Sequence, residues 1–140
     1  MHQIVFVATI AAAEELEFEE SPANHFPCMS TQQIHRDARA QLYCTVTGDF
    51  LDESFSKEEL FKSFGDEGPY IYALDRHLMT QLARLDEDDL IRVAQHWATC
   101  AEIEQLALDT QDLVDFLEQY VHFCQIASND DMTFFLYSDD

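Results

Sequence analysis

The sequence predicts a helix-dominated α+β fold, in which four to five helices pack on a small sheet that includes the N- and C-terminal strands. Three observations support this class. Apolar residues recur every three or four positions through most of the chain, which is typical of amphipathic helices. Short β-branched and aromatic runs stand near both ends. Three glycines and three prolines are few, which favours long regular elements over many tight turns.

Length and composition indicate one domain that spans residues 1–140. A chain of this size can bury roughly two thirds of its unfolded surface, so folding requires neither metal nor disulfide. Hydrophobic residues make up 47% and aromatic residues 12% of the chain. Disordered acidic tails lack such residues, so we expect a packed body with an acidic surface.

The first elements follow from local composition. Gln3 to Ala8 is β-branched and aromatic, which predicts a strand. In Glu14 to Glu20 acids alternate with Leu16 and Phe18, and both an edge strand and a frayed helix fit this pattern. Two prolines predict a loop over residues 21–27.

Two capping boxes suggest the next helices. Ser30 to Gln33 predicts a helix start, with the helix running to about Val46 and ending at Gly48. Ser56 to Glu59 repeats the pattern and predicts a short helix through Phe64.

The second half of the sequence predicts three more helices and a strand. Pro69 suits a first helical position, Asp86 a helix cap, and Asp109 the start of the last helix. A strand is predicted from Met132 to Tyr137, and it should pair with the first strand or share its sheet. The expected apolar stripes are Ile71, Leu74, Leu78, Leu82 and Leu85; then Leu90, Val93, Ala94, Trp97, Cys100 and Ala101; then Leu113, Leu117, Tyr120, Val121, Cys124 and Ala127.

Charge is the most one-sided property of the chain. The formal net charge is −21, and all seven lysines and arginines lie between Arg36 and Arg92. Such a surface repels nucleic acid and anionic membranes and attracts basic partners. A halophilic source or selection for solubility would also account for the acidity. The apolar run of residues 4–13 follows no basic residue and is too short to span a membrane, so we expect a cytoplasmic protein.

Catalytic and cofactor motifs are absent from the sequence. No phosphate-binding glycine motif, no G-x-S-x-G and no C-x-x-C pair occurs. His96 and Cys100 stand four residues apart, a spacing that can hold one metal ion, but Cys100 lies on an apolar stripe and is expected to be a buried thiol. We therefore predict no cofactor, no metal site and no enzymatic activity.

Two groups of residues are candidates for a site. Acidic residues on two helices, with a nearby tyrosine as anchor, would form the contact with a partner. The alternative is a pocket wall around the single tryptophan. The first group is Glu87, Asp88, Asp89, Asp112, Asp115, Glu118 and Tyr120, and the second is His96, Trp97 and Glu102.

A wider pattern of residues gives a family resemblance. The stretches Phe26 to Met29, Leu42 to Gly48, Gly68 to Tyr72, Leu82 to Leu85, Val93 to Thr99 with Glu102, and Phe123 to Ala127 occur in this order. This pattern resembles small acidic bacterial proteins of unknown function, of the type carried on mobile gene cassettes or beside toxin genes. The resemblance covers about residues 26–137. It implies an inhibitory or protective binding role and no particular active site.

Three hypotheses of function remain. The first is a non-enzymatic acidic protein that engages a basic protein partner, either to neutralise a toxin or to mimic nucleic acid. The second is a small-molecule-binding domain or enzyme that uses the pocket near Trp97. The third is a homodimeric accessory protein whose C-terminal strand pairs with a second copy.

Overall fold

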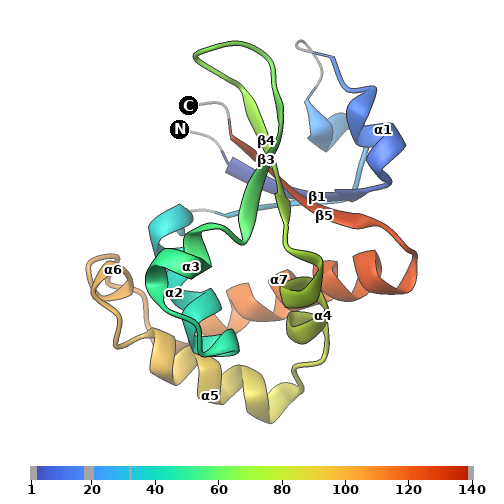
Figure 1. Cartoon of the computed structure of the whole chain (residues 1–140). Coiled ribbons are helices and arrows are strands. Elements are labelled where there is room, and N and C mark those ends of the chain that lie inside the picture. The colour runs from blue at the N-terminus through green and yellow to red at the C-terminus, as the bar shows by residue number, and fades with distance from the viewer. Residues whose placement is uncertain (1–2, 18–20, 32, 139–140) are drawn as a thin grey trace.

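A five-stranded antiparallel sheet carries the fold, and most of the helices lie on one of its faces (Figure 1). The computed structural model describes residues 3–17, 21–31 and 33–138. The strand order is β2-β1-β5-β4-β3, so the predicted α+β class is confirmed. The elements are β1 (Gln3–Ala8), α1 (Ile10–Glu14), a 3-10 turn (Pro22–Asn24), β2 (Cys28–Ser30), α2 (Arg36–Thr47), α3 (Leu51–Phe55), β3 (Glu58–Ser63), β4 (Tyr70–Leu74), α4 (Arg76–Ala83), α5 (Glu87–Trp97), α6 (Ala101–Glu104), α7 (Thr110–Asn129) and β5 (Thr133–Ser138).

The predicted pairing of the first and last strands is confirmed. Strand β1 pairs with β5 along its whole length, from Gln3 opposite Ser138 to Ala8 opposite Thr133. The other edge of β5 pairs with β4, so β5 is the central strand. The hypothesis of dimerisation through the C-terminal strand is therefore wrong, because both edges of β5 are already hydrogen-bonded. A homodimer formed through another surface stays a prediction.

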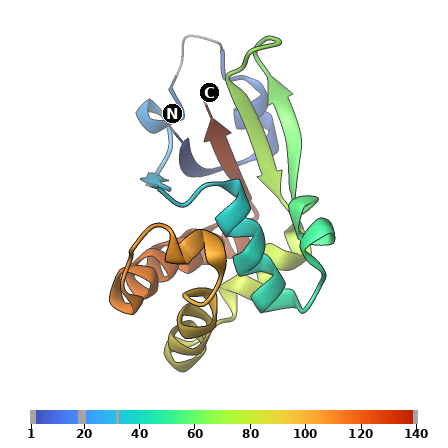
Figure 2. The ribbon, with the colours of Figure 1, turned by 90° about the vertical axis from the view of Figure 1, so that its left-hand side faces the viewer.

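Two hydrophobic clusters form because successive side chains of a strand point to opposite faces of the sheet. Val5, Val7, Phe134 and Leu136 pack against the helical layer of α2, α4, α5 and α7. Phe6 and its neighbours face α1 on the other side, in a smaller cluster. Figures 1 and 2 show this division, with the helical layer on one side of the sheet and α1 on the other.

Several helix signals of the sequence are confirmed by the cap geometry. Asp86 and Asp109 each form a complete capping box, with Asp89 and Asp112 respectively. Gly48 ends α2 in the left-handed conformation, at φ 78°, which a residue without Cβ adopts without strain. All six residues of the expected stripe of the last helix are buried: Leu113, Leu117, Tyr120, Val121, Cys124 and Ala127.

The hairpin of β3 and β4 contradicts two predictions. Residues 58–63, expected to continue a helix from the Ser56 capping box, form β3 instead. Pro69, expected to open a helix, lies in the hairpin loop after a cis peptide bond, and residues 70–74 form β4. The helix of this region begins only at Arg76, where Asp75 caps it. Strand pairing outweighed the local helix signals, because β3 pairs with β4, whose Ile71 and Leu74 are buried in the sheet.

Three boundaries near the N-terminus also differ. Helix α2 begins at Arg36 rather than beside Ser30, because Ser30 belongs to β2 and pairs with Ile4 of β1. Glu14 is the last residue of α1, residues 15–17 belong to no strand or helix, and residues 18–20 lie outside the described part of the chain. The predicted loop of residues 21–27 contains a 3-10 turn at Pro22–Asn24. None of the described helices is long and apolar enough to cross a lipid bilayer.

Candidate functional site

Two positively charged side chains, Arg39 and Lys62, hold elements of the fold together. Arg39 pairs with the buried Glu58, and the Nζ of Lys62 donates to the carbonyl oxygens of Glu14 and Leu16 at the end of α1. In the described residues, only a few of the 28 carboxylates of the sequence form an ion pair with a lysine or an arginine. These pairs are Arg39–Glu58, Lys57–Asp49, Arg76–Asp131 and Arg92–Asp89.

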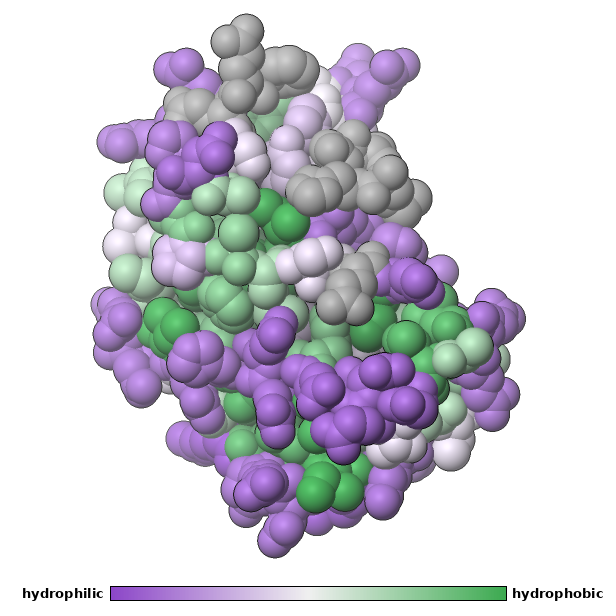
Figure 3. Space-filling model, turned by 180° about the vertical axis from the view of Figure 1, so that it is seen from behind, coloured by the Kyte–Doolittle hydropathy of each residue, from purple (hydrophilic) through white to green (hydrophobic). Residues whose placement is uncertain are grey.

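The first half of α7 carries an exposed acidic face. The capping box at its start fixes two of the carboxylates: the Asp112 amide donates to Asp109 Oδ1 at 2.8 Å, and the Asp109 amide donates to Asp112 Oδ2 at 3.3 Å. Asp115 and Glu118 follow at helical spacing, and both are exposed. Figure 3 shows a band of hydrophilic side chains across the middle of this face of the molecule, where α7 is outermost.

A recess of about 260 Å³ lies beside this acidic face. Its apolar wall is formed by Ile34, Leu108 and Phe116, and its polar wall by Asp112 and Asp115. Gln119 completes the lining. Among residues 3–17, 21–31 and 33–138, no lysine or arginine is within ion-pair distance of either carboxylate. We call this site the α7 recess.

The other predicted acids lie at the far end of the same helix pair. Helices α5 and α7 run in opposite directions (Figure 1), and Trp97 at the end of α5 packs on Phe116, with ring centroids 6.0 Å apart. Glu87, Asp88 and Asp89 start α5, eight to ten residues and about 12–15 Å from that contact. The six predicted acids lie on neighbouring helices, as expected, but they form two separate groups rather than one surface.

Tyr120 was predicted to anchor a partner, and this prediction is wrong. Its side chain is fully buried, and its hydroxyl lies 2.5 Å from that of Tyr43. It cannot contact a partner, because the helical layer and the sheet enclose it. The ring of Phe134 in β5 lies 4.9 Å from its ring.

Tyr120 belongs instead to a buried polar network. Glu58 accepts hydrogen bonds from Arg39 Nε at 2.8 Å, Arg39 Nη2 at 2.9 Å and the Tyr43 hydroxyl at 2.5 Å. The remaining Arg39 nitrogen donates to the Gln3 side chain and to the Ile34 carbonyl. The network therefore ties α2 to β3, β1 and α7, and every charge in it is paired.

Burial controls the ionisation of this network. Burial and then the Glu58 carboxylate raise the pKa of the Tyr43 and Tyr120 hydroxyls well above the usual tyrosine value. Burial by itself would lower the pKa of the Arg39 guanidinium, but Glu58 raises it above its usual range. Arg39 thus stays charged and both tyrosines stay neutral. Neutral, enclosed tyrosines are typical of a structural network and not of a general base.

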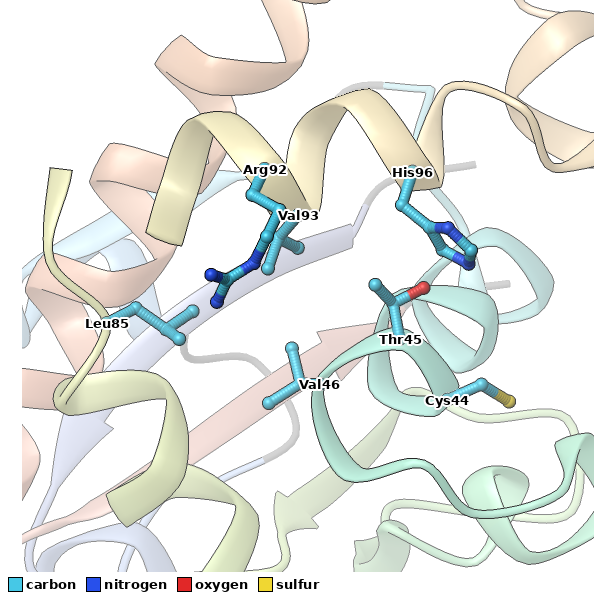
Figure 4. Close-up of a pocket in the computed structure, with 7 residues that line it drawn as sticks. All are labelled: Cys44, Thr45, Val46, Leu85, Arg92, Val93 and His96. Carbon is cyan, nitrogen blue, oxygen red and sulfur yellow. The ribbon is translucent and has the colours of Figure 1, made fainter. Parts of the chain in front are cut away.

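The predicted pocket around Trp97 is formed only in part. His96 lines a cavity of about 350 Å³ between α2 and α5, together with Arg92 and Thr45. Figure 4 shows the His96 ring facing Thr45, while Arg92 extends toward Leu85. Trp97 is fully buried and donates from Nε1 to the Ala38 carbonyl at 2.9 Å, so it is a core residue.

Glu102, the third residue predicted for that pocket, lies outside the cavity lining. Its carboxylate accepts a hydrogen bond from the Gln41 side chain, which links α6 to α2. Of the three pocket candidates, the structure therefore places only His96 at the cavity, and it adds Arg92, which sequence reasoning missed.

The described residues offer no centre for cysteine or metal chemistry. Each of the four cysteines carries a free thiol, and Cys124 is buried on the apolar face of α7. Burial, and then the Glu102 carboxylate, raise the pKa of the Cys100 thiol, which disfavours a reactive thiolate. The described residues include no cluster of three or more His, Cys, Asp or Glu side chains that could hold a metal ion.

Comparison with known proteins yields no match to a family model, to a curated protein or to a solved structure. The resemblance to small acidic bacterial proteins thus stays a prediction, and the site has to be interpreted from its geometry.

Proposed function

We propose that this protein is a non-enzymatic binding protein that engages a basic protein partner through the α7 recess. The proposal depends on one observation. Exposed carboxylates without a lysine or arginine partner among the described residues lie beside an apolar wall in the same recess. Asp112 and Asp115 supply the charge, and Ile34, Leu108 and Phe116 supply the wall. A basic partner fits both features of the site.

The chemistry of lysine and arginine explains this fit. Both side chains carry an apolar stem that packs on hydrophobic surface while the charged head stays at a polar rim. An arginine stem on the wall of Ile34 and Phe116 would bring its guanidinium to the carboxylates, where charge-assisted hydrogen bonds are stronger than neutral ones. A volume of about 260 Å³ accommodates one such side chain.

The net charge of the protein acts at longer range. With a formal charge of −21, the surface attracts a basic partner before contact and repels acidic competitors. Two kinds of partner suit such a surface: a toxin with a basic face, and a protein that normally binds nucleic acid. The predicted resemblance to proteins encoded beside toxin genes favours the toxin.

A pull-down from a lysate of the source organism distinguishes binding at the α7 recess from attraction by the net charge of the protein. The variant D112N/D115N removes two charges at the recess, and the control E87Q/D88N removes two at the exposed start of α5. We expect the native protein to retain a basic protein at low salt and to release it at high salt. The recess variant should lose this protein and the control should keep it.

Equal loss in both variants would show that only net charge matters, and it would refute the recess. Recovery of no basic protein at low ionic strength would refute the whole proposal.

The cavity between α2 and α5 supports a second candidate, a small-molecule-binding function. His96 and Arg92 offer polar contacts there, and Val46, Leu85 and Val93 offer an apolar wall. Thermal-shift screening of a metabolite library against the native protein and the His96→Gln variant tests this idea. A ligand that stabilises the native protein more than the variant would support it, and a library without any stabilising ligand would contradict it.

A further inference from the structure

A third recess lies between the first turn of α2 and strands β4 and β5. Its volume is about 180 Å³. Arg36 of α2, Tyr72 of β4 and Leu136 of β5 line it, and the buried pair of Arg39 and Glu58 forms its polar end. This site differs from the α7 recess in both position and charge.

Arg36 is held in place from several sides. Its Nη2 donates to the Phe55 carbonyl at 2.9 Å and to the Glu58 carbonyl at 3.3 Å. The guanidinium carbon also lies 5.4 Å from the centre of the Tyr72 ring and 6.0 Å from that of Phe55. These contacts fix the plane of the guanidinium group, so little conformational entropy is lost when it binds a further group.

Part of the Arg36 guanidinium is still available to bind a ligand. Its Nε and Nη1 atoms have no hydrogen bond to any residue in the described part of the chain. Arg36 is exposed to solvent and lines the recess, so these donors are accessible. Nε shares its bidentate edge with Nη2, as in the Arg39–Glu58 pair, and Nη2 of Arg36 already donates to two carbonyls. Nη1 is therefore the donor that can bind one oxygen of a carboxylate.

The other charges of the recess cancel. Arg39 and Glu58 are each 3% exposed and neutralise one another through two hydrogen bonds. Arg36 therefore leaves the lining with an excess of positive charge, although the protein as a whole is strongly acidic.

The walls select for a flat ligand. Tyr70 and Tyr72 lie side by side on β4, with ring centroids 6.3 Å apart, and Tyr137 and Leu136 border the same space. An apolar cavity of about 150 Å³ holds benzene, so a recess of this volume accommodates one aromatic ring with a small substituent.

From this arrangement we infer that the recess binds a small aromatic carboxylate, with one carboxylate oxygen on Nη1 of Arg36 and the ring against Tyr70 and Tyr72. The inference is independent of the proposed protein partner. Its residues lie on α2, β4 and β5, whereas the acids of the α7 recess lie on α7.

Titration followed by two-dimensional amide NMR tests the inference with three probes in about 0.15 M salt. Benzoate carries both the ring and the charge, benzamide carries the ring alone, and acetate carries the charge alone. We expect benzoate to shift the amide signals of Tyr72 and Leu136 and to bind at least about tenfold tighter than either other probe, which corresponds to about 1.4 kcal/mol. Equal binding of benzoate and benzamide, or of benzoate and acetate, would overturn the inference.

Two variants with the same change in charge locate the site. Arg36→Gln should weaken benzoate binding about tenfold or more. Arg84→Gln, at the exposed end of α4 and outside the linings of the three sites, should leave it unchanged. Equal weakening in both variants would show a general effect of charge and refute the site. If Arg36→Gln does not fold, the comparison of the three probes on the native protein still decides the question.

Discussion

Replacement of Glu58 by glutamine should destabilise the protein more than any exposed substitution. Glu58 accepts two hydrogen bonds from Arg39 and one from Tyr43, and it is 3% exposed. The variant leaves the Arg39 guanidinium buried without a counter-charge. Breaking a buried pair in this way costs about 3–5 kcal/mol, against a total stability of about 5–15 kcal/mol for a typical domain.

Urea unfolding followed by tryptophan fluorescence measures this change. The chain has a single tryptophan, Trp97, and its complete burial makes it a sensitive reporter of unfolding. The midpoint should fall while the m-value stays constant, because the surface exposed on unfolding is nearly the same.

A double variant separates the unpaired charge from the loss of contacts. Arg39→Met with Glu58→Leu removes both charges, and it should be less destabilised than Glu58→Gln alone, since no buried ion is left unpaired. A loss below about 1 kcal/mol for Glu58→Gln would contradict the reasoning, as would additive losses for the two sites of the double variant.

Three further outcomes are expected. Because burial raises the pKa of Cys124, Tyr43 and Tyr120 in the folded state, their contribution to stability is complete below the unfolded pKa values of 9.0 and 10.0 and is lost as the pH rises above them. The unfolding free energy should fall there by about 1.4 kcal/mol per pH unit and group, and Cys124→Ala should reduce the loss between pH 9 and 10, as urea titrations at each pH can show. Trp97→Phe should cost about 1–3 kcal/mol in urea unfolding followed by far-UV circular dichroism, because the Ala38 carbonyl loses its donor. Added sodium chloride should raise the melting temperature in calorimetry, because it screens a net charge of −21.

Sequence reasoning succeeded where the signal was local. The caps at Asp86 and Asp109 and the stripe of α7 depend on residues three or four positions apart, and the structure confirms them. The helix predicted over Tyr70–Leu74 was wrong, because Ile71, Leu74 and Leu78 fit a helical period although the segment is a strand. Its aromatic and β-branched composition, after a loop with Gly65 and Gly68, was the signal that could have identified a hairpin.

The candidate sites were harder to predict than the fold. Nothing near Arg39 in the sequence indicates that a strand nineteen residues later supplies its partner Glu58. The apolar wall of the α7 recess likewise combines Ile34 with Phe116. Such sites depend on tertiary contacts between distant segments, so single-sequence patterns contain the acids of the recess but not its shape.

The position of β5 determines when this sheet can form during translation. Strands β1 and β2 and the hairpin of β3 and β4 leave the ribosome first, but the strand that joins them is residues Thr133–Ser138. Two-stranded ribbons are marginally stable in water. The nascent chain therefore cannot complete the sheet until β5 emerges, and its apolar strands depend on the forming helices, or on chaperones, for cover.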